Sequence, residues 1–426
     1  MRRSQFRLRS RLQPLLSRVG VPPGDLHRNR FAFCGSLTDA LDLYNTPHPE
    51  IIVRDNGKTG QRRASIAGVQ RCRNPHICPV CAPVVRWQRA KEVDAVAARH
   101  LESGGGLLFL TLTVRHKRGD DPRALRKGVS AAWSRITGLR AWRRDWRDTG
   151  KVLGYCRSWD WTHGGNSAGS NGAHPHLHML IFTGEPFSDA DVEGFRSFLV
   201  DEWRKRVATS LGTDHIPTDD VGVDVGLVRD AAAISAYQTK VSVGITMELL
   251  DPAAAKRPRQ RAGQGARFTM WQVFALATEG WTWAIRESVL FAEAMRGAPV
   301  VSWSDSMREA YKELLGAAKD RDIPDDVFDQ SEKELLAAAP GDDCEEQRVR
   351  IPLPVWDILA SRKPDGDAIT DLLDEAERFG ADRVRRTVAE IEIALGLRAP
   401  PEEPDPDVPK PPPKLPPYQT EPLFPV

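Results

Sequence analysis

The pattern of apolar residues predicts a sheet in the first half of the chain. Residues 107–114 are continuously apolar and β-branched, which indicates a buried strand. Two further strands are expected at 152–162 and 174–183, with the glycine- and serine-rich loop 163–172 between them. These two strands should therefore form a long hairpin. A shorter apolar run at 221–228 predicts a fourth strand.

Apolar residues at helical spacing predict the elements that cover this sheet. Helices are expected at residues 84–100, 122–147, 188–210 and 230–239. Ser188 and Asp189 suit the start of the third of them. After residue 268 the chain is mostly helical, with two or three helices over 351–397. Together these elements predict an α+β fold with an antiparallel sheet core flanked by helices, an N-terminal zinc-binding segment and a mostly helical C-terminal region.

Changes in composition divide the chain into five segments. Residues 1–31 are an arginine-rich arm, expected to be mobile, and 32–101 form a cysteine-rich segment. Residues 102–250 hold the sheet, 251–398 a mostly helical accessory region, and 399–426 a proline-dense tail expected to be disordered. A transit peptide is the alternative interpretation of the arm. No run of about 18 uncharged apolar residues exists, so we expect a cytoplasmic protein without a membrane span.

The net charge of +2 conceals strong segregation of charge. Basic residues gather in 2–30, in 115–147 with three tryptophans interleaved, and in 256–261, whereas 322–346 is acidic. Local patches rather than net charge determine affinity for phosphate backbones. Solvated helix faces are the alternative for each cluster. The residues predicted to bind DNA are Arg115, Arg140, Arg143 and Arg144.

Three of the six cysteines, Cys72, Cys78 and Cys81, lie within ten residues. This spacing suits a metal site in a reducing compartment better than disulfide bonds. Cys34 or His76 could complete a tetrahedral Zn²⁺ site of structural type, and Cys34 is preferred because thiolate is the softer ligand. Three buried free thiols are the alternative. The remaining cysteines, at 156 and 344, are expected to be structural or incidental, with Cys344 in an acidic loop.

The segment 172–182 (GAHPHLHMLIF) carries the most informative pattern. Side chains alternate between the faces of a strand, so His176 and His178 should project together, with His174 on the same face. Asp160 lies on the partner strand of the expected hairpin. Two imidazoles and one carboxylate leave open positions on Mg²⁺ or Mn²⁺. Alone, however, a His-x-His pair is more often structural than catalytic.

Downstream, Tyr237 and Lys240 are three residues apart on an expected helix and therefore share one face. The His-hydrophobic-His strand followed by Tyr-x-x-Lys resembles the HUH endonucleases. Within them, residues 30–310 are most similar to the replication initiator (Rep) proteins of rolling-circle plasmids. The strand 109–116, the cysteine cluster 72–81 and Ser302-Trp-Ser304 contribute to the resemblance.

The resemblance implies a mechanism. A metal held by His176, His178 and Asp160 polarises the scissile phosphodiester, and Tyr237 attacks phosphorus. This leaves a 5′-phosphotyrosyl link and a 3′-hydroxyl primer, while Lys240 stabilises the charge, and the strand is rejoined later. The implied partner is origin DNA, single-stranded or in a hairpin, with the host helicase or polymerase as further candidates.

Two departures from the family pattern bear on this assignment. Glutamate is usual where Asp160 stands here, and Glu185 and His174 are the reserve ligands. Ala233 occupies the position one turn before the tyrosine, where some initiators carry a second acid or tyrosine, so the route of termination is open. Alternatives are an HUH-type single-strand transposase, which usually has two tyrosines, a mobilisation relaxase, a metal-dependent hydrolase of small substrates and a non-catalytic zinc-containing DNA-binding regulator. The sequence predicts no oligomeric state.

Overall fold

The fold was analysed in a computed structural model. It describes residues 2–19, 30–36, 49–56, 62–166, 170–218, 221–228, 267–317, 319–336, 344–360, 362–363 and 366–399. The helix expected at 230–239, which carries Tyr237 and Lys240, lies outside the described residues. So do the basic cluster 256–261 and nearly all of the proline-dense tail.

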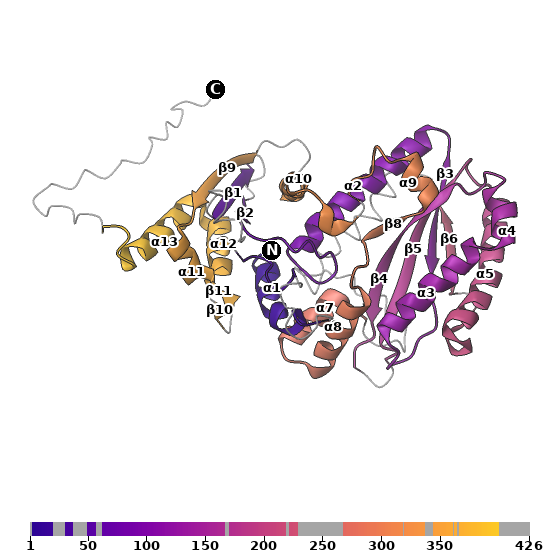
Figure 1. The fold of residues 1–426 in the computed structure, drawn as a ribbon, viewed down its shortest axis with the longest axis horizontal. Helices are drawn as coiled ribbons and strands as arrows, with labels where there is room; N and C mark the ends of the chain where they lie inside the picture. Colours follow the sequence, from indigo (N-terminus) through magenta and orange to yellow (C-terminus); the bar gives the residue numbers. More distant parts are fainter. Residues whose placement is uncertain are drawn as a thin grey trace, which may run out of the picture.

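A six-stranded antiparallel sheet forms the centre of the larger lobe, on the right of Figure 1. Its strand order is β6-β3-β5-β4-β7, and β8 pairs with the other end of β4. The strands are β3 (Gly106–Leu112), β4 (Gly154–His163), β5 (Ala173–Thr183), β6 (Val223–Leu227), β7 (Phe268–Thr269) and β8 (Val301–Trp303). The four predicted strands and the hairpin of β4 and β5 are confirmed, as is the α+β class.

Helices α3 (Pro122–Thr137) and α5 (Asp189–Leu211) cover one face of this sheet. Ser188 caps α5, accepting a hydrogen bond from the N–H of Asp191, as its position predicts. The short helix α4 (Arg140–Trp142) and a π-helical turn (Arg143–Arg147) follow α3. The core on this face consists of alternate strand residues and helix aromatics, including Leu108, Leu110, Leu112, Leu177, Met179, Trp133, Phe195 and Trp203.

The opposite face carries the intervening strand residues, among them Thr111, His176 and His178. At one end of this face, Leu180 and Phe182 pack against α2 (Cys81–Glu102). Helix α9 (Asp305–Ala310) closes the same end through Met307. The histidines therefore lie beyond the part of β5 that these helices bury.

A smaller lobe, on the left of Figure 1, joins the two ends of the chain. Strand β1 pairs on one side with β2 and on the other with β9, although β9 follows almost 300 residues later in sequence. The elements of this lobe are β1 (Glu50–Asn56), β2 (Arg62–Ala67), β9 (Cys344–Arg350), α11 (Leu353–Ala360), β10 (Arg362–Lys363), β11 (Gly366–Asp367), α12 (Ala368–Phe379) and α13 (Ala381–Ala394). Cys344 thus begins a strand rather than lying in a loop.

The arginine-rich arm is not extended where the structure describes it. Residues Arg2–Leu16 form helix α1, which contacts α7 (Met270–Thr278), α8 (Thr282–Ala294) and α12. Leu8, Leu12 and Leu16 are buried at a spacing of four residues, so the arginines lie between positions of an apolar stripe. The expectation of a mobile arm is therefore wrong for α1.

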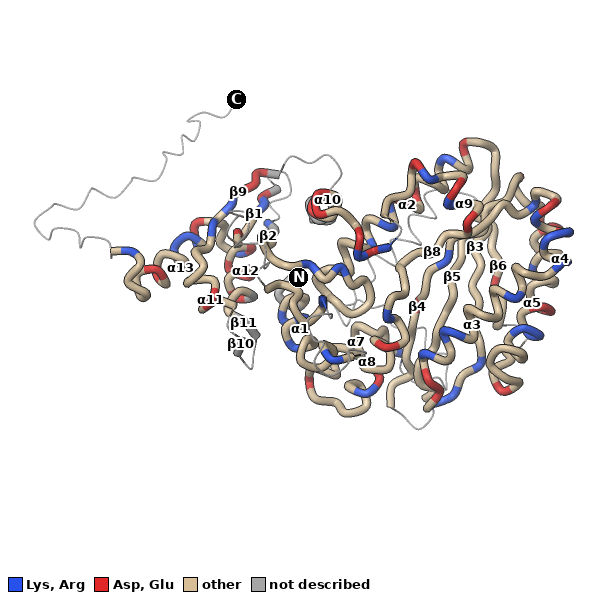
Figure 2. Tube along the Cα trace, viewed as in Figure 1, with Lys and Arg blue, Asp and Glu red and all other residues tan. Residues whose placement is uncertain are grey.

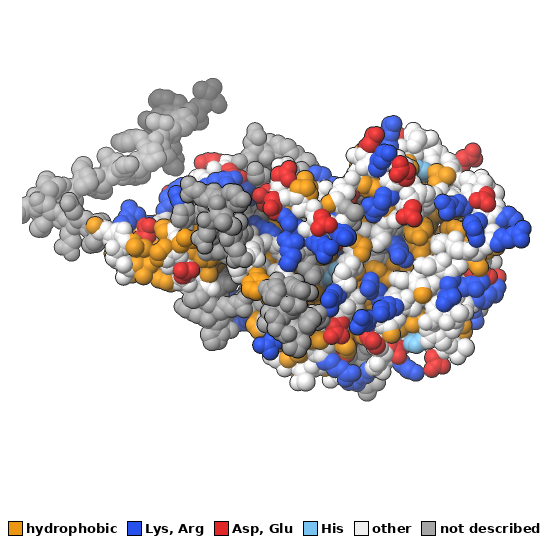
Figure 3. All heavy atoms as spheres, viewed as in Figure 1, with side chains coloured by type: hydrophobic (Ala, Val, Ile, Leu, Met, Phe, Trp, Pro, Cys, Tyr) orange, Lys and Arg blue, Asp and Glu red, His pale blue; other side chains and the backbone are white. Residues whose placement is uncertain are grey.

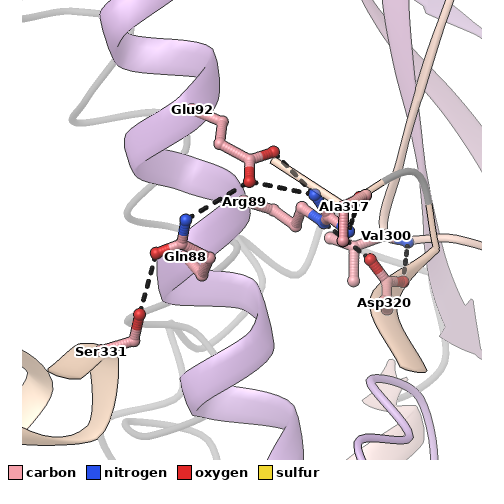
Figure 4. Close-up of polar contacts among 7 residues, drawn as sticks. All are labelled: Gln88, Arg89, Glu92, Val300, Ala317, Asp320 and Ser331. Carbon is pink, nitrogen blue, oxygen red and sulfur yellow. Dashed lines mark hydrogen bonds and ion pairs between the residues drawn. The ribbon is translucent and has the colours of Figure 1, made fainter. Parts of the chain in front are cut away.

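A buried polar network joins α2 to residues far along the chain (Figure 4). The Arg89 guanidinium lies 2.8 Å from Glu92 and 2.7 Å from Asp320, and it donates to the carbonyl of Ala317. Gln88, one residue earlier, accepts a hydrogen bond from Ser331 in α10 (Asp325–Leu336). No helix among the described residues is long and apolar enough to cross a membrane.

Candidate active site and metal centre

A row of imidazoles lines the uncovered part of the sheet. His174, His176 and His178 occupy alternate positions of β5, with ring centroids 4.1 Å and 6.0 Å apart. His116, which follows β3, stacks on His174 at 4.2 Å. The strand periodicity thus brings the predicted histidines to one face, as expected, and the register of β3 adds a fourth ring.

Asp160 lies beside this row. It pairs with His176 in the β4–β5 register, and its Oδ2 is 3.9 Å from Nε2 of His178. This separation is too long for a hydrogen bond but suits two ligands that approach one cation from different sides. The Asp160 side chain is 54 % exposed, so water or a substrate oxygen can reach the same place.

The Nδ1 atoms of His176 and His178 are in different environments. Nδ1 of His178 lies 3.0 Å from Oγ1 of Thr111, which leaves Nε2 facing Asp160. Nδ1 of His176 is buried and has no hydrogen-bond partner among the described residues. A buried unsatisfied nitrogen is unusual unless a ligand completes the site. Imidazole nitrogens and a carboxylate are donors of the types that bind divalent cations.

The ionisation states favour metal binding. Burial lowers the pKa of His176 to about 4, although Asp160 opposes the shift, and it lowers the pKa of His174 to about 2 with the help of His176. Desolvation raises the pKa of Asp160, but the contact with His178 and the charges of the imidazoles outweigh it and hold this pKa at about 2. Near neutral pH, His176 is therefore neutral and Asp160 ionised, which are the forms that ligate metals.

Sequence reasoning missed four residues around this face. Thr111 pairs with His178 on one side and with Asp224 of β6 on the other. His116 belongs to the imidazole row, and Arg267 is close enough to lower the pKa of His174 and His176. The available signal was a polar residue, Thr111, at an alternate position in an otherwise apolar strand. Arg267 gives no sequence signal, because it reaches the site through the pairing of β7 with β4.

The predicted DNA-binding arginines are not grouped at this face. Arg115 is exposed and adjoins His116, whereas Arg140, Arg143 and Arg144 are exposed in and after α4, which lies beside α5 at the right of Figure 2. The interleaved tryptophans, at 133, 142 and 146, are buried among the aromatic residues of α5 and cannot stack on bases. The structure thus separates this basic stretch from the histidines.

A second candidate metal site is buried near α1. The Sγ atoms of Cys34, Cys72, Cys78 and Cys81 all lie within 4.8 Å of one another. Sγ of Cys34 is 3.7 Å from that of Cys78 and 3.6 Å from that of Cys81. Four thiolates around Zn²⁺ in a tetrahedron have sulfur atoms about 3.8 Å apart, so the geometry is compatible with zinc.

The chemistry of these thiols agrees with a closed structural site. Burial raises the pKa of Cys72 and Cys78 well above the ordinary value, so a cation is needed to keep all four sulfurs ionised. His76, the alternative fourth ligand, instead lies with Nε2 2.8 Å from the carbonyl oxygen of Ala298. Burial lowers the pKa of His76 to about 3, so it is a neutral, hydrogen-bonded core residue.

Comparison with known proteins agrees with this arrangement. A family model described as "Replication protein" matches residues 63–233, which contain three of the four clustered cysteines and the strands from β3 to β6. "Protein rep" of Streptomyces lividans is 25% identical over 343 residues, which cover 67% of this chain and 71% of that protein. No solved structure matches significantly. As the sequence resemblance predicted, this part of the chain is similar to replication proteins of the Rep type.

Proposed function

We propose that this protein initiates rolling-circle replication of a plasmid by nicking its origin DNA. The observation that carries the proposal is the approach of Asp160 to His178 across the β4–β5 hairpin, with His176 next in the row. These three side chains lie within the region that matches the replication-protein family. A half-exposed carboxylate beside neutral imidazoles suits a metal-assisted reaction on phosphate.

His176, His178 and Asp160 would hold Mg²⁺ or Mn²⁺, which supplies Lewis-acid polarisation of a phosphoryl oxygen. Thr111 orients the His178 ring, so that its Nε2 points to the same place as the Asp160 carboxylate. His116 and His174 pack beside the ligand pair and limit the motion of His176. The sheet thus presents ligands on a rigid face with open coordination positions.

Tyr237 is the proposed nucleophile, and it lies outside the described residues. Its phenolic oxygen forms a bond to phosphorus as the bond from phosphorus to the 3′-oxygen breaks, and the leaving oxygen takes a proton to become a 3′-hydroxyl. Lys240 places a positive charge near the phosphate or the phenolate. Attack of a 3′-hydroxyl on the phosphotyrosyl ester reverses these bond changes and rejoins the strand.

The 3′-hydroxyl would prime a host polymerase, and a host helicase would open the duplex ahead of it. The cysteine cluster would hold Zn²⁺ in a structural role, next to α1. The protein would act in the cytoplasm. A single-strand transposase would use the same site, and a DNA-binding regulator would use only the cysteine cluster and the basic surface.

The test is formation of a covalent adduct. Full-length protein is incubated with Mn²⁺ and labelled single-stranded origin DNA, then denatured and separated by size. We expect a protein–DNA adduct that disappears in Tyr237→Phe and His178→Ala and persists in Tyr155→Phe, a tyrosine packed on the opposite face of the sheet. Binding of the DNA without any adduct in the wild-type protein would support the regulator instead.

A further inference from the structure

A cavity of about 660 Å³ lies between the cysteine-bearing loop, the end of α1 and the end of α8. Phe31, Ile77 and Met295 contribute apolar walls. The turn Asp320–Asp322 closes another side. The volume is in the range of about 300–1,000 Å³ that is typical of small-molecule and cofactor sites.

The charge of the lining is strongly unbalanced. Among the described residues, five cations line the cavity, namely Arg30, Arg73, Arg296, Lys319 and Arg321, against the single acid Asp320. Asp320 is already engaged, since Oδ1 accepts from Nε of Arg89 at 2.7 Å and Oδ2 from the N–H of Val300 at 2.8 Å. Figure 3 shows Lys and Arg side chains gathered near the centre of this face, below α10.

Within the described residues, the partner of Arg321 is an exposed acid, and those of Arg30 are neutral. Nε of Arg321 lies 3.6 Å from Oδ1 of Asp322, and both side chains are more than half exposed, so solvent weakens this pair. Arg30 donates to the carbonyl oxygens of Arg71 at 3.2 Å and Arg321 at 3.4 Å, which are neutral acceptors. Lys319 forms no ion pair within the described part of the chain. Arg73, by contrast, is buried beside the cysteines and pairs with Asp325. The exposed cations at the cavity mouth are therefore suited to an anion such as a phosphodiester.

Helix α8 connects the cavity to the end of β4, at the edge of the sheet. At the start of this helix, Trp283 stacks on His163 at 5.4 Å and Glu287 lies 3.4 Å from Nε2 of the same ring. His163 ends β4, the strand that carries Asp160, although strand alternation directs these two side chains to opposite faces of the sheet. Met295 lies twelve residues beyond Trp283, or about 18 Å at the rise of an α-helix. A single DNA strand could extend over that length.

We propose that this cavity binds a nucleotide of single-stranded DNA away from the scissile phosphate, with its phosphate on Arg296, Lys319 and Arg321 and its base against the apolar walls. The inference rests on the proposed function, since the strand bound in the cavity is the one that the histidine face would cut. It places recognition of the strand between the cysteine cluster and α8, rather than on the arginines near α5. A free nucleotide carries the same phosphate and base and is the competing ligand for the cavity.

The test compares two triple substitutions in full-length protein carrying Tyr237→Phe, so that no adduct can form. One variant is Arg296→Gln/Lys319→Gln/Arg321→Gln. The matched control, Arg123→Gln/Lys127→Gln/Arg135→Gln, removes the same charge from exposed positions of α3. Affinity for a labelled single-stranded oligonucleotide is measured by fluorescence anisotropy at several salt concentrations.

We expect the cavity variant to bind about tenfold more weakly, with a salt slope reduced by about 2, while the control changes little. Equal losses in both variants would overturn the proposal. So would displacement of the oligonucleotide by thymidine monophosphate as effectively as by unlabelled DNA, because the cavity would then take a free nucleotide. Thermal melting checks folding, and the single variant Lys319→Gln, which removes an exposed group, should show part of the loss.

The affinity test and the adduct test distinguish failure of the cavity proposal from failure of the proposed nicking reaction. If the wild-type protein forms no adduct but the cavity variant loses affinity, the cavity stands and the nicking reaction does not. If adduct forms at Tyr237 while both triple variants bind DNA equally, the nicking reaction stands and the cavity proposal is wrong.

Discussion

Oγ1 of Thr111 lies 3.0 Å from Nδ1 of His178, across the pairing of β3 with β5. This contact fixes the orientation of the imidazole, because it uses one ring nitrogen and leaves the other directed at Asp160. Partners of this kind orient metal-ligating histidines and increase their basicity.

Thr111→Val should therefore weaken metal binding without unfolding the protein. Valine has nearly the same shape but cannot hydrogen-bond to Nδ1, and we expect the Kd for Mn²⁺ at the histidine face to rise about tenfold. Isothermal titration of zinc-loaded protein measures it. Thr111→Ser keeps the hydroxyl and should restore most of the affinity; equal affinity in the valine variant would show that Thr111 does not orient the ligand.

Cys34→Ser should remove the bound zinc and destabilise the protein. Cys34 supplies one of four sulfurs, and Gln13 of α1 donates to its carbonyl at 3.0 Å, so the loss should also loosen α1. Metal content by mass spectrometry and the thermal midpoint provide the readout. Cys156→Ser is the control, because that thiol is buried in β4 outside the cluster. Zinc retained in the Cys34 variant would contradict the assignment.

Arg89→Met should be among the most destabilising single changes away from the sites. Glu92 and Asp320 would be left buried without their cation, at a cost of about 3–5 kcal/mol in the free energy of unfolding. Lys312→Met breaks only an exposed pair with Glu309 and should cost less than about 1 kcal/mol. Urea denaturation measures both. Similar midpoints for the two variants would show that the network in Figure 4 is not stabilising.

Acid should destabilise the metal-free histidine face. The folded protein lowers the pKa of His176 from 6.5 to about 4 and that of His174 from 6.5 to about 2. Below pH 6.5 the unfolded chain therefore binds protons that the folded chain does not. The contribution of the neutral imidazoles to folding stability is complete above pH 6.5 and is lost as the pH falls toward the pKa values of the folded state. Thermal midpoints of the protein at a series of pH values should decline by several degrees on acidification.

The matched comparison for this pH dependence is His174→Gln against His215→Gln, which lies outside the row of imidazoles. Only His174→Gln should reduce the fall of the thermal midpoint on acidification. An unchanged slope in His174→Gln would mean that its imidazole is protonated equally in both states.

The sequence allowed the sheet and its histidine face to be predicted because strand alternation is a local rule. The hairpin loop at 163–172 and the apolar runs on either side were enough to pair β4 with β5 and to bring Asp160 opposite His176. Cys34 was chosen as a zinc ligand from the softness of sulfur alone, since 37 residues separate it from Cys72. The structure places these two thiols in one cluster.

The errors concern long-range burial, which local patterns do not encode. The arginines of α1 suggested an exposed arm, but Leu12 and Leu16 dock it onto the core. Trp142 and Trp146 are interleaved with the basic residues of 115–147 in sequence, yet they are the apolar contacts of a helix layer. Strand β9 could not be foreseen, because its partner β1 lies at the other end of the chain.

The nicking reaction is tested most sharply by locating the nucleotide on the protein after the reaction. Protein incubated with Mn²⁺ and single-stranded origin DNA is digested with nuclease and protease, and the modified peptide is sequenced by tandem mass spectrometry. We expect a nucleotide 5′-phosphate on Tyr237, formed only when His176, His178 and Asp160 are intact. Modification of another residue, or an adduct that forms equally well in His178→Ala, would contradict it.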